Sequence, residues 1–138
     1  MNHYVFEDLT LGLEHFFDVT ITAAMLERFY DISGDSNPLH IDSAYAKAKG
    51  FPDQVVYGML TASFYSTLVG VHLPGKNALL YGVNTTFHQP VFIGDILTVH
   101  GIVHHVHEDY KLIEIKAFIV NQHKKKVSKA KIKVGLHE

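Results

Sequence analysis

The stretch QVVYGMLTASFYSTLVGVHLPG, residues 54–75, contains no Asp, Glu, Lys or Arg. It is long enough for a membrane span, which needs about 20 mostly apolar residues, but Thr, Ser and Tyr interrupt it. Gly58 and Gly70 reduce its apolar character further. We therefore expect a helix over 58–71 that protein covers on most sides, because it has no charged face to turn toward water.

Beyond this helix the apolar residues recur with a period of two, which predicts β-strands. In the strand expected near 113–119, Ile113 and Ile115 share one face, while Glu114 and Lys116 lie on the other. Gly82 predicts a bulge or a close backbone approach in the strand expected near 78–88. The strands are expected near 78–88, 96–107, 113–119 and 130–134, with an earlier one at 15–20 that can join the sheet.

Two shorter helices are expected before the uncharged one. Thr22 can cap the first, and Asp42 can cap the second. The expected ranges are 23–32, ended by Ser33-Gly34, then a loop to Ile41, then a short helix through Ala44, Tyr45 and Ala48 that Gly50 closes.

These elements predict an α+β architecture in which a meander of about four antiparallel strands curves around the uncharged helix, the arrangement called the hot-dog fold. The 138 residues suit one domain, so we expect a single domain over 1–138. One small sheet leaves a strand edge and part of the helix uncovered. Pairing of two subunits would cover both, so we expect a homodimer.

Composition excludes several classes of protein. The formal net charge is −2, so there is no basic excess to hold nucleic acid or an anionic membrane. Cysteine is absent, which rules out disulfides, thiolate metal sites and cysteine nucleophiles. The first residues lack the basic and apolar regions of a signal peptide, so we expect a cytoplasmic location.

The segment YDISGDSNPLH, residues 30–40, places a carboxylate, an amide and an imidazole in one short loop. Gly34 and Pro38 control the backbone, so the loop can aim Asp35 and His40 at one point. A carboxylate and an imidazole around one water form a general acid–base pair. On residue types alone, Asp35 and Asn37 could equally be turn or capping residues.

The same segment resembles the hydratase-2 motif of the MaoC-like dehydratases, the (R)-specific enoyl-CoA hydratases. That resemblance implies the hot-dog fold, with Asp35 and His40 as the catalytic dyad and Asn37 helping to hold the loop. It covers most of the chain. The matching residues are Tyr30, Ser33-Gly34-Asp35, Asn37-Pro38-Leu39-His40, Asp42, Tyr45-Ala46, Gly50-Phe51, Gly58-Met59-Leu60, Ser63, Ser66, Leu73-Pro74-Gly75, Phe87, Pro90-Val91-Phe92 and Gly94-Asp95.

The start of the uncharged helix is the second candidate site. A backbone N–H at a helix N-terminus suits an enolate-like oxygen, and the family uses the amide that matches Gly58 as an oxyanion hole. Gly58 could also be a packing glycine. The resemblance places Ser63 and Ser66 near the site, although a buried helix serine can instead bond its own backbone. Tyr57 departs from the family, which usually has His there, and this puts local hydrogen bonding in question.

The resemblance implies hydration of trans-2-enoyl-CoA to (R)-3-hydroxyacyl-CoA, or the reverse dehydration, with no cofactor. The thioester carrier could also be acyl carrier protein. A hot-dog thioesterase usually needs a carboxylate on the central helix, and residues 54–75 have none. A non-catalytic acyl-thioester-binding module would have no need of the Asp35/His40 pair.

Histidine is unusually frequent, with 11 residues. A strict period of two along 96–107 places His105 and His107 on one face and His100 and His104 on the other. A metal site needs three or four converging ligands, so we expect no metal. His88 is expected to be structural. Lys124-Lys125-Lys126 predicts a solvated turn that could also attract the phosphates of coenzyme A.

Overall fold

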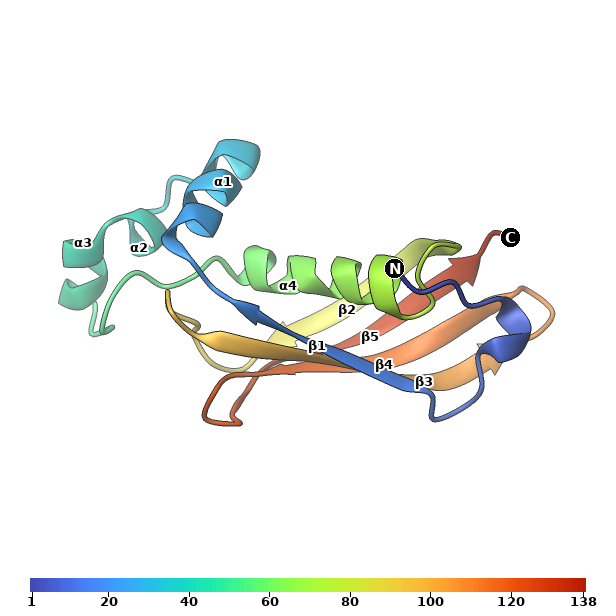
Figure 1. The fold of residues 1–138 in the computed structure, drawn as a ribbon. Coiled ribbons are helices and arrows are strands. Elements are labelled where there is room, and N and C mark those ends of the chain that lie inside the picture. The colour runs from blue at the N-terminus through green and yellow to red at the C-terminus, as the bar shows by residue number, and fades with distance from the viewer.

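The computed structural model describes all residues 1–138 and contains one five-stranded sheet in the order β1-β3-β4-β5-β2, with every neighbouring pair antiparallel. Helix α4 (Gly58–Thr67) lies along one face of the sheet and continues as a π-helical segment at Leu68–His72, as Figure 1 shows. The strands are β1 Glu14–Thr20, β2 Ala78–Phe87, β3 Ile96–His107, β4 Leu112–Val120 and β5 Lys126–Leu136. The predicted α+β hot-dog architecture is confirmed.

The core lies between α4 and the sheet. Alternate residues of β3, β4 and β5 are buried against the helix, as the period of two requires. The hydroxyl of Tyr65, on α4, donates a 2.8 Å hydrogen bond to Ser128 on β5, so the polar atoms of this interface are paired. None of the helices combines the length and the hydropathy that crossing a bilayer requires.

Gly101 on β3 allows the helical layer to approach the sheet closely. A Cβ at this position would lie 2.7 Å from a methyl carbon of Leu68, whose side chain is fully buried. It would also lie 3.2 Å from Ile115. The absent side chain therefore sets how deeply the C-terminal end of the helical layer settles on the strands.

We expect Gly101→Ala to lower the free energy of unfolding by about 1–3 kcal/mol. The steric overlap in the folded core costs more than alanine gains by reducing the conformational entropy of the unfolded chain. Urea unfolding followed by circular dichroism measures the change. Gly70→Ala is the matched control, since a Cβ there meets no atom within 4 Å. An equal loss of stability in the two variants would contradict the close-approach explanation.

Three shorter helices form a separate group before α4, at the far left of Figure 1. They are α1 (Ala23–Ser33), α2 (Pro38–Ile41) and α3 (Ser43–Ala48). Thr22 and Asp42 cap α1 and α3 as predicted, and Gly34 ends α1 with φ 69°. The loop predicted up to Ile41 was wrong at its end, because α2 occupies 38–41. A 3₁₀ turn at Phe6–Asp8 was not predicted.

The strand order also differs from a simple meander. Strands β3, β4 and β5 follow one another, but β2 pairs with β5 at the far edge, because β1 occupies the other side of β3. The predicted irregularity at Gly82 is confirmed: the register between β2 and β5 shifts between Leu80 and Gly82. The two sheet edges are therefore β1 and β2.

Candidate active site

Short local hydrogen bonds fix the loop from Ser33 to Asn37. The Ser33 hydroxyl donates to the Phe29 carbonyl at 2.7 Å and accepts from the Asp35 N–H at 3.1 Å. One oxygen of the Asp35 carboxylate accepts from the Asn37 N–H at 3.1 Å. The turn reading of Asp35 is thus correct, and it leaves the second carboxylate oxygen without a protein partner.

Asn37 holds the loop by capping the helix that follows. Its side-chain oxygen accepts a 3.0 Å hydrogen bond from the Leu39 N–H, and Pro38 stands in the first turn, where a missing N–H costs nothing. This cap begins α2, the single helical turn that carries His40. The sequence-based role of Asn37 as a loop-holding residue is consistent with this geometry.

His40 is held in one ring orientation. Its Nδ1 lies 2.6 Å from the Val55 carbonyl oxygen, which can only accept, so Nδ1 carries the proton. Nε2 has no hydrogen-bond partner in the protein, so in the neutral ring its lone pair is free. Gln54 supports the turn by donating from its amide to the His40 carbonyl at 3.1 Å.

Tyr57 joins the two halves of the site. Its hydroxyl donates to the Asp35 carbonyl at 2.8 Å, and its ring stacks on the His40 imidazole with centroids 4.2 Å apart. Burial raises the pKa of the Tyr57 hydroxyl, and the negative charge of Asp35 raises it further. Tyr57 therefore stays neutral and acts as a hydrogen-bond donor that ties the loop to α4.

A cleft of about 360 Å³ brings His40 and Gly58 together. Gly58 is the first residue of α4, and its N–H donates to no group in the protein, as expected for the first turn of a helix. The Phe87 ring lies close above it, 3.4 Å from where a Cβ would stand. The lining residues are His40, Val55, Val56, Gly58, Thr61, Phe87, His88, Gln89, Pro90, Val91 and Val127.

The structure separates the other predicted residues from this cleft. Ser63 and Ser66 are exposed on α4 and do not line it, and the Ser63 hydroxyl donates to the Leu60 carbonyl at 2.6 Å. The backbone-bonding alternative therefore describes Ser63. Asp35 lies outside the lining as well, and its side chain makes no hydrogen bond to His40.

Several cleft residues were not predicted from the sequence. Thr61 lies one turn after Gly58 on α4, a spacing that could have indicated it. His88, taken as structural from sequence, lines the cleft and stands 3.2 Å from the Thr86 hydroxyl. Gln54 and Val55 act through contacts to His40 that only the fold reveals.

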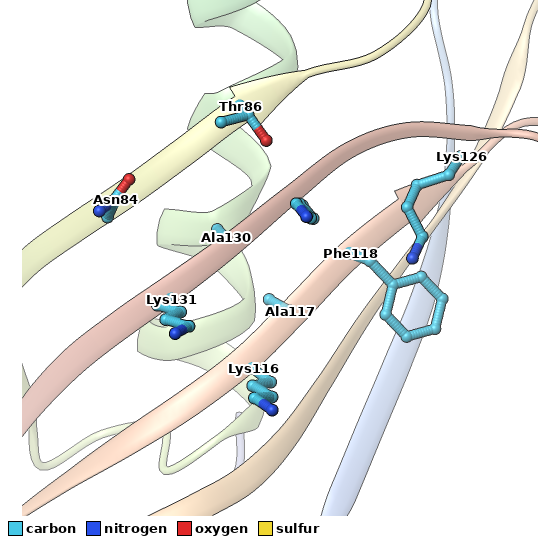
Figure 2. A pocket seen from close by; sticks show the side chains of 9 residues that line it. Asn84, Thr86, Lys116, Ala117, Phe118, Lys126, Ala130 and Lys131 are labelled. Atoms are coloured by element: carbon cyan, nitrogen blue, oxygen red, sulfur yellow. The ribbon is translucent and has the colours of Figure 1, made fainter.

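A second, basic pocket opens on the sheet and contains none of the predicted site residues (Figure 2). Four lysines contribute to it, and the Lys126 ammonium lies 5.2 Å from the centre of the Phe118 ring. Of the Lys124–Lys126 tract, only Lys126 takes part. The lining residues are Asn84, Thr86, Lys116, Ala117, Phe118, Lys126, Lys129, Ala130 and Lys131.

Two curated proteins with similar sequences act, by name, on CoA thioesters. The (R)-specific enoyl-CoA hydratase of Aeromonas caviae is 39% identical over 100 residues, which span 72% of this chain and 75% of that protein. The 3-hydroxybutyryl-CoA dehydratase of Methylorubrum extorquens is 35% identical over 94 residues, 68% of this chain and 60% of that protein.

Solved structures agree over nearly the whole chain. The (R)-hydratase from A. caviae superposes with a TM-score of 0.91 at 33% identity and covers 95% of this chain and 99% of its own. The R-hydratase PhaJ1 from Pseudomonas aeruginosa gives a TM-score of 0.91 at 28% identity, covering 96% of this chain and 85% of its own. The family described as MaoC like domain matches residues 12–128. The chain therefore belongs to the MaoC-like family.

Proposed function

We propose that this protein hydrates trans-2-enoyl-CoA to (R)-3-hydroxyacyl-CoA and catalyses the reverse dehydration, with Asp35 and His40 acting on one water and no cofactor. The observation that carries this is the pairing, in one cleft, of a ring-locked imidazole and a free helix N-terminal amide. The hydratases named above are similar in sequence and in fold. Membership of the family supports a hydro-lyase activity.

In the proposed reaction the Asp35/His40 pair handles the protons, and the Gly58 N–H stabilises the negative charge on the thioester oxygen. The water oxygen bonds to C3 while one of its protons passes to the Asp35/His40 pair, and the pair then returns a proton to C2, where the enolate electrons form the new C–H bond. The electrons of the double bond move toward the thioester oxygen, where enolate-like charge develops. The free Gly58 N–H, reinforced by the dipole of α4, would stabilise that charge. The proton acceptor is assigned to the pair and not to either residue alone.

The carrier of the acyl chain is proposed to be coenzyme A, because the first similar proteins act, by name, on CoA thioesters. A mitochondrial 3-hydroxyacyl-[acyl-carrier-protein] dehydratase of Arabidopsis thaliana is 36% identical over 70 residues, 51% of this chain and 41% of that protein. The alternative carrier is therefore acyl carrier protein. Parallel assays with crotonyl-CoA and crotonyl-acyl carrier protein distinguish the two.

We expect the purified protein to remove the enoyl absorbance of crotonyl-CoA and to form the (R) product. In deuterated water the hydroxyl and the deuterium should arrive on the same face of the double bond, because one short segment supplies both catalytic groups. Chiral analysis and proton NMR of the product measure this. Anti addition or an (S) product would place acid and base on opposite faces and contradict the proposal, and so would unchanged absorbance.

We also propose that the protein is a homodimer joined along β2. This edge strand exposes Leu80, Val83 and Phe87, which face the same side of the sheet as their buried partners on β5. Met59, at the N-terminal end of α4, is a further exposed apolar residue, with 64% of its surface accessible. A second β2 edge would pair the unpaired backbone and cover these side chains. The substrate thioester would then enter near the subunit boundary.

Light scattering should give twice the mass of one chain at micromolar concentration. Val83→Lys should shift the protein toward the monomer, because it places a charge in the apolar surface that the partner must cover. Thr86→Lys is the control, since it adds the same charge to the opposite face of the same strand. A stable monomer in the parent protein would rule out the dimer.

A further inference from the structure

A β-bulge redirects the histidines at the end of β3. The register with β4 runs regularly until Val103 pairs with Ile115, and then His105 pairs with Glu114, so His104 is an extra residue. The bulge reverses the alternation, so His105 and His107 lie on the outward face, flanking the partly buried Val106. The assignment of His105 and His107 to the face opposite His100 was wrong, because strict alternation ignores the bulge.

Glu114 on β4 then completes a group of three. It stands directly across from His105, and its carboxylate oxygen lies 3.3 Å from His107 Nε2. The two imidazole rings meet edge to face, with centroids 4.1 Å apart. One ligand atom from each residue lies within 4.8 Å of the others. The expectation of only two ligands on a face therefore missed Glu114, which comes from the neighbouring strand.

We propose that His105, His107 and Glu114 form a binding site for a zinc-class divalent transition metal. Two ligands of a tetrahedral zinc at about 2.0–2.1 Å lie roughly 3.4 Å apart, close to the His107–Glu114 separation. All three ligand atoms already lie within 4.8 Å of one another, so reaching that value requires only side-chain rotation of partly exposed groups. Two imidazoles and a carboxylate suit zinc and copper better than magnesium or calcium, which prefer all-oxygen ligands. Water would complete the coordination.

The site lies away from the proposed chemistry. Figure 1 shows the β3–β4 hairpin at the end of the sheet opposite α1, α2 and α3, whereas His40 is on α2. Nothing else in the protein forms an ion pair with Glu114: Lys133, directly across on β5, lies beyond ion-pair distance. The metal would therefore bridge β3 and β4 next to their turn and stabilise the hairpin, without acting in hydration.

Titration of the purified, tag-free and chelator-treated protein with zinc chloride tests the site. We expect one tight equivalent per chain and a thermal midpoint a few degrees higher with zinc. His107→Ala and Glu114→Gln should each weaken zinc binding about tenfold or more, since even the loss of a residue that only supports a ligand costs this much. With one equivalent of Cu²⁺, electron paramagnetic resonance should show two coordinating nitrogens, and only one in His105→Ala.

The control is His104→Ala, which removes an exposed imidazole from the bulge but leaves the three ligands in place. It should bind zinc as the parent does. Equal weakening in His104→Ala and His107→Ala would mean that surface histidines bind zinc unspecifically, and the proposal would fail. It would fail equally if the parent took up no stoichiometric zinc, or if the ligand variants bound zinc unchanged.

Discussion

Replacing His40 by alanine should lower the turnover of crotonyl-CoA hydration by at least ~10²-fold, the usual effect of removing a general acid–base group. The ring is oriented by the Val55 carbonyl and leaves Nε2 without a protein partner, so the substitution removes the proton-transferring atom itself. The fold should survive, because the side chain projects from a single helical turn outside the core cluster. Initial rates with crotonyl-CoA and circular dichroism measure the two effects.

His88→Ala is the matched control for this prediction. Its imidazole lines the same cleft, but its Nε2 faces the Thr86 hydroxyl and no backbone carbonyl fixes the ring. We expect this variant to change KM more than kcat, because a wall residue contributes to binding in the ground state and the transition state alike. If the two variants lost kcat to the same degree, the special role of His40 would be refuted.

Most of the fold could be predicted from local patterns. The uncharged stretch 54–75 predicted α4, and the period of two predicted β3 to its observed ends, Ile96 and His107. The strand order was not predicted, because it depends on contacts between strands that are distant in sequence. The place of β2 beside β5 depends on β1 occupying the edge of β3, and no local pattern contains that choice.

The bulge at His104 was missed for a related reason. A bulge is an extra residue on one strand relative to its partner strand. The sequence of one strand alone therefore shows only a continuing alternation of inward and outward residues. By contrast, the irregularity near Gly82 was predictable, because a glycine within a strand is itself a signal. The consequence was large at His105 and His107, whose predicted face was reversed.

From the sequence, candidate site residues could be proposed where one short segment carries them. Asp35, Asn37 and His40 all lie within residues 35–40. The structure pairs Asn37 with the nearby Leu39 N–H, whereas the partner of His40 is the Val55 carbonyl, which is distant in sequence. Thr61 and His88, which also line the cleft, were not predicted, because only the packing of α4 against β2 brings them near His40. Tyr57 was singled out as a departure from the family, and its bond to Asp35 gives that departure a structural role.

Asp35→Asn should lower the turnover by at least ~10²-fold while leaving the loop intact. The amide oxygen of asparagine can still accept the bond from the Asn37 N–H, now 3.1 Å from the carboxylate, so the turn should persist. What disappears is the negative charge and the capacity to take a proton. A loss in kcat with KM nearly unchanged would therefore report chemistry and not misfolding.

Asp31→Asn separates this effect from a general loss of charge near the site. Asp31 is an exposed carboxylate on the last turn of α1, four residues before Asp35, and it lines the neighbouring cleft that His40 also borders. Its neutralisation should change turnover less than about threefold, as expected for a screened charge that transfers no proton. If Asp31→Asn lowered turnover as much as Asp35→Asn, the loss would come from the electrostatic field of this surface. Asp35 would then have no role in moving a proton. If Asp35→Asn kept near-full turnover with its fold intact, His40 would have to act without a carboxylate partner, and the dyad would be refuted.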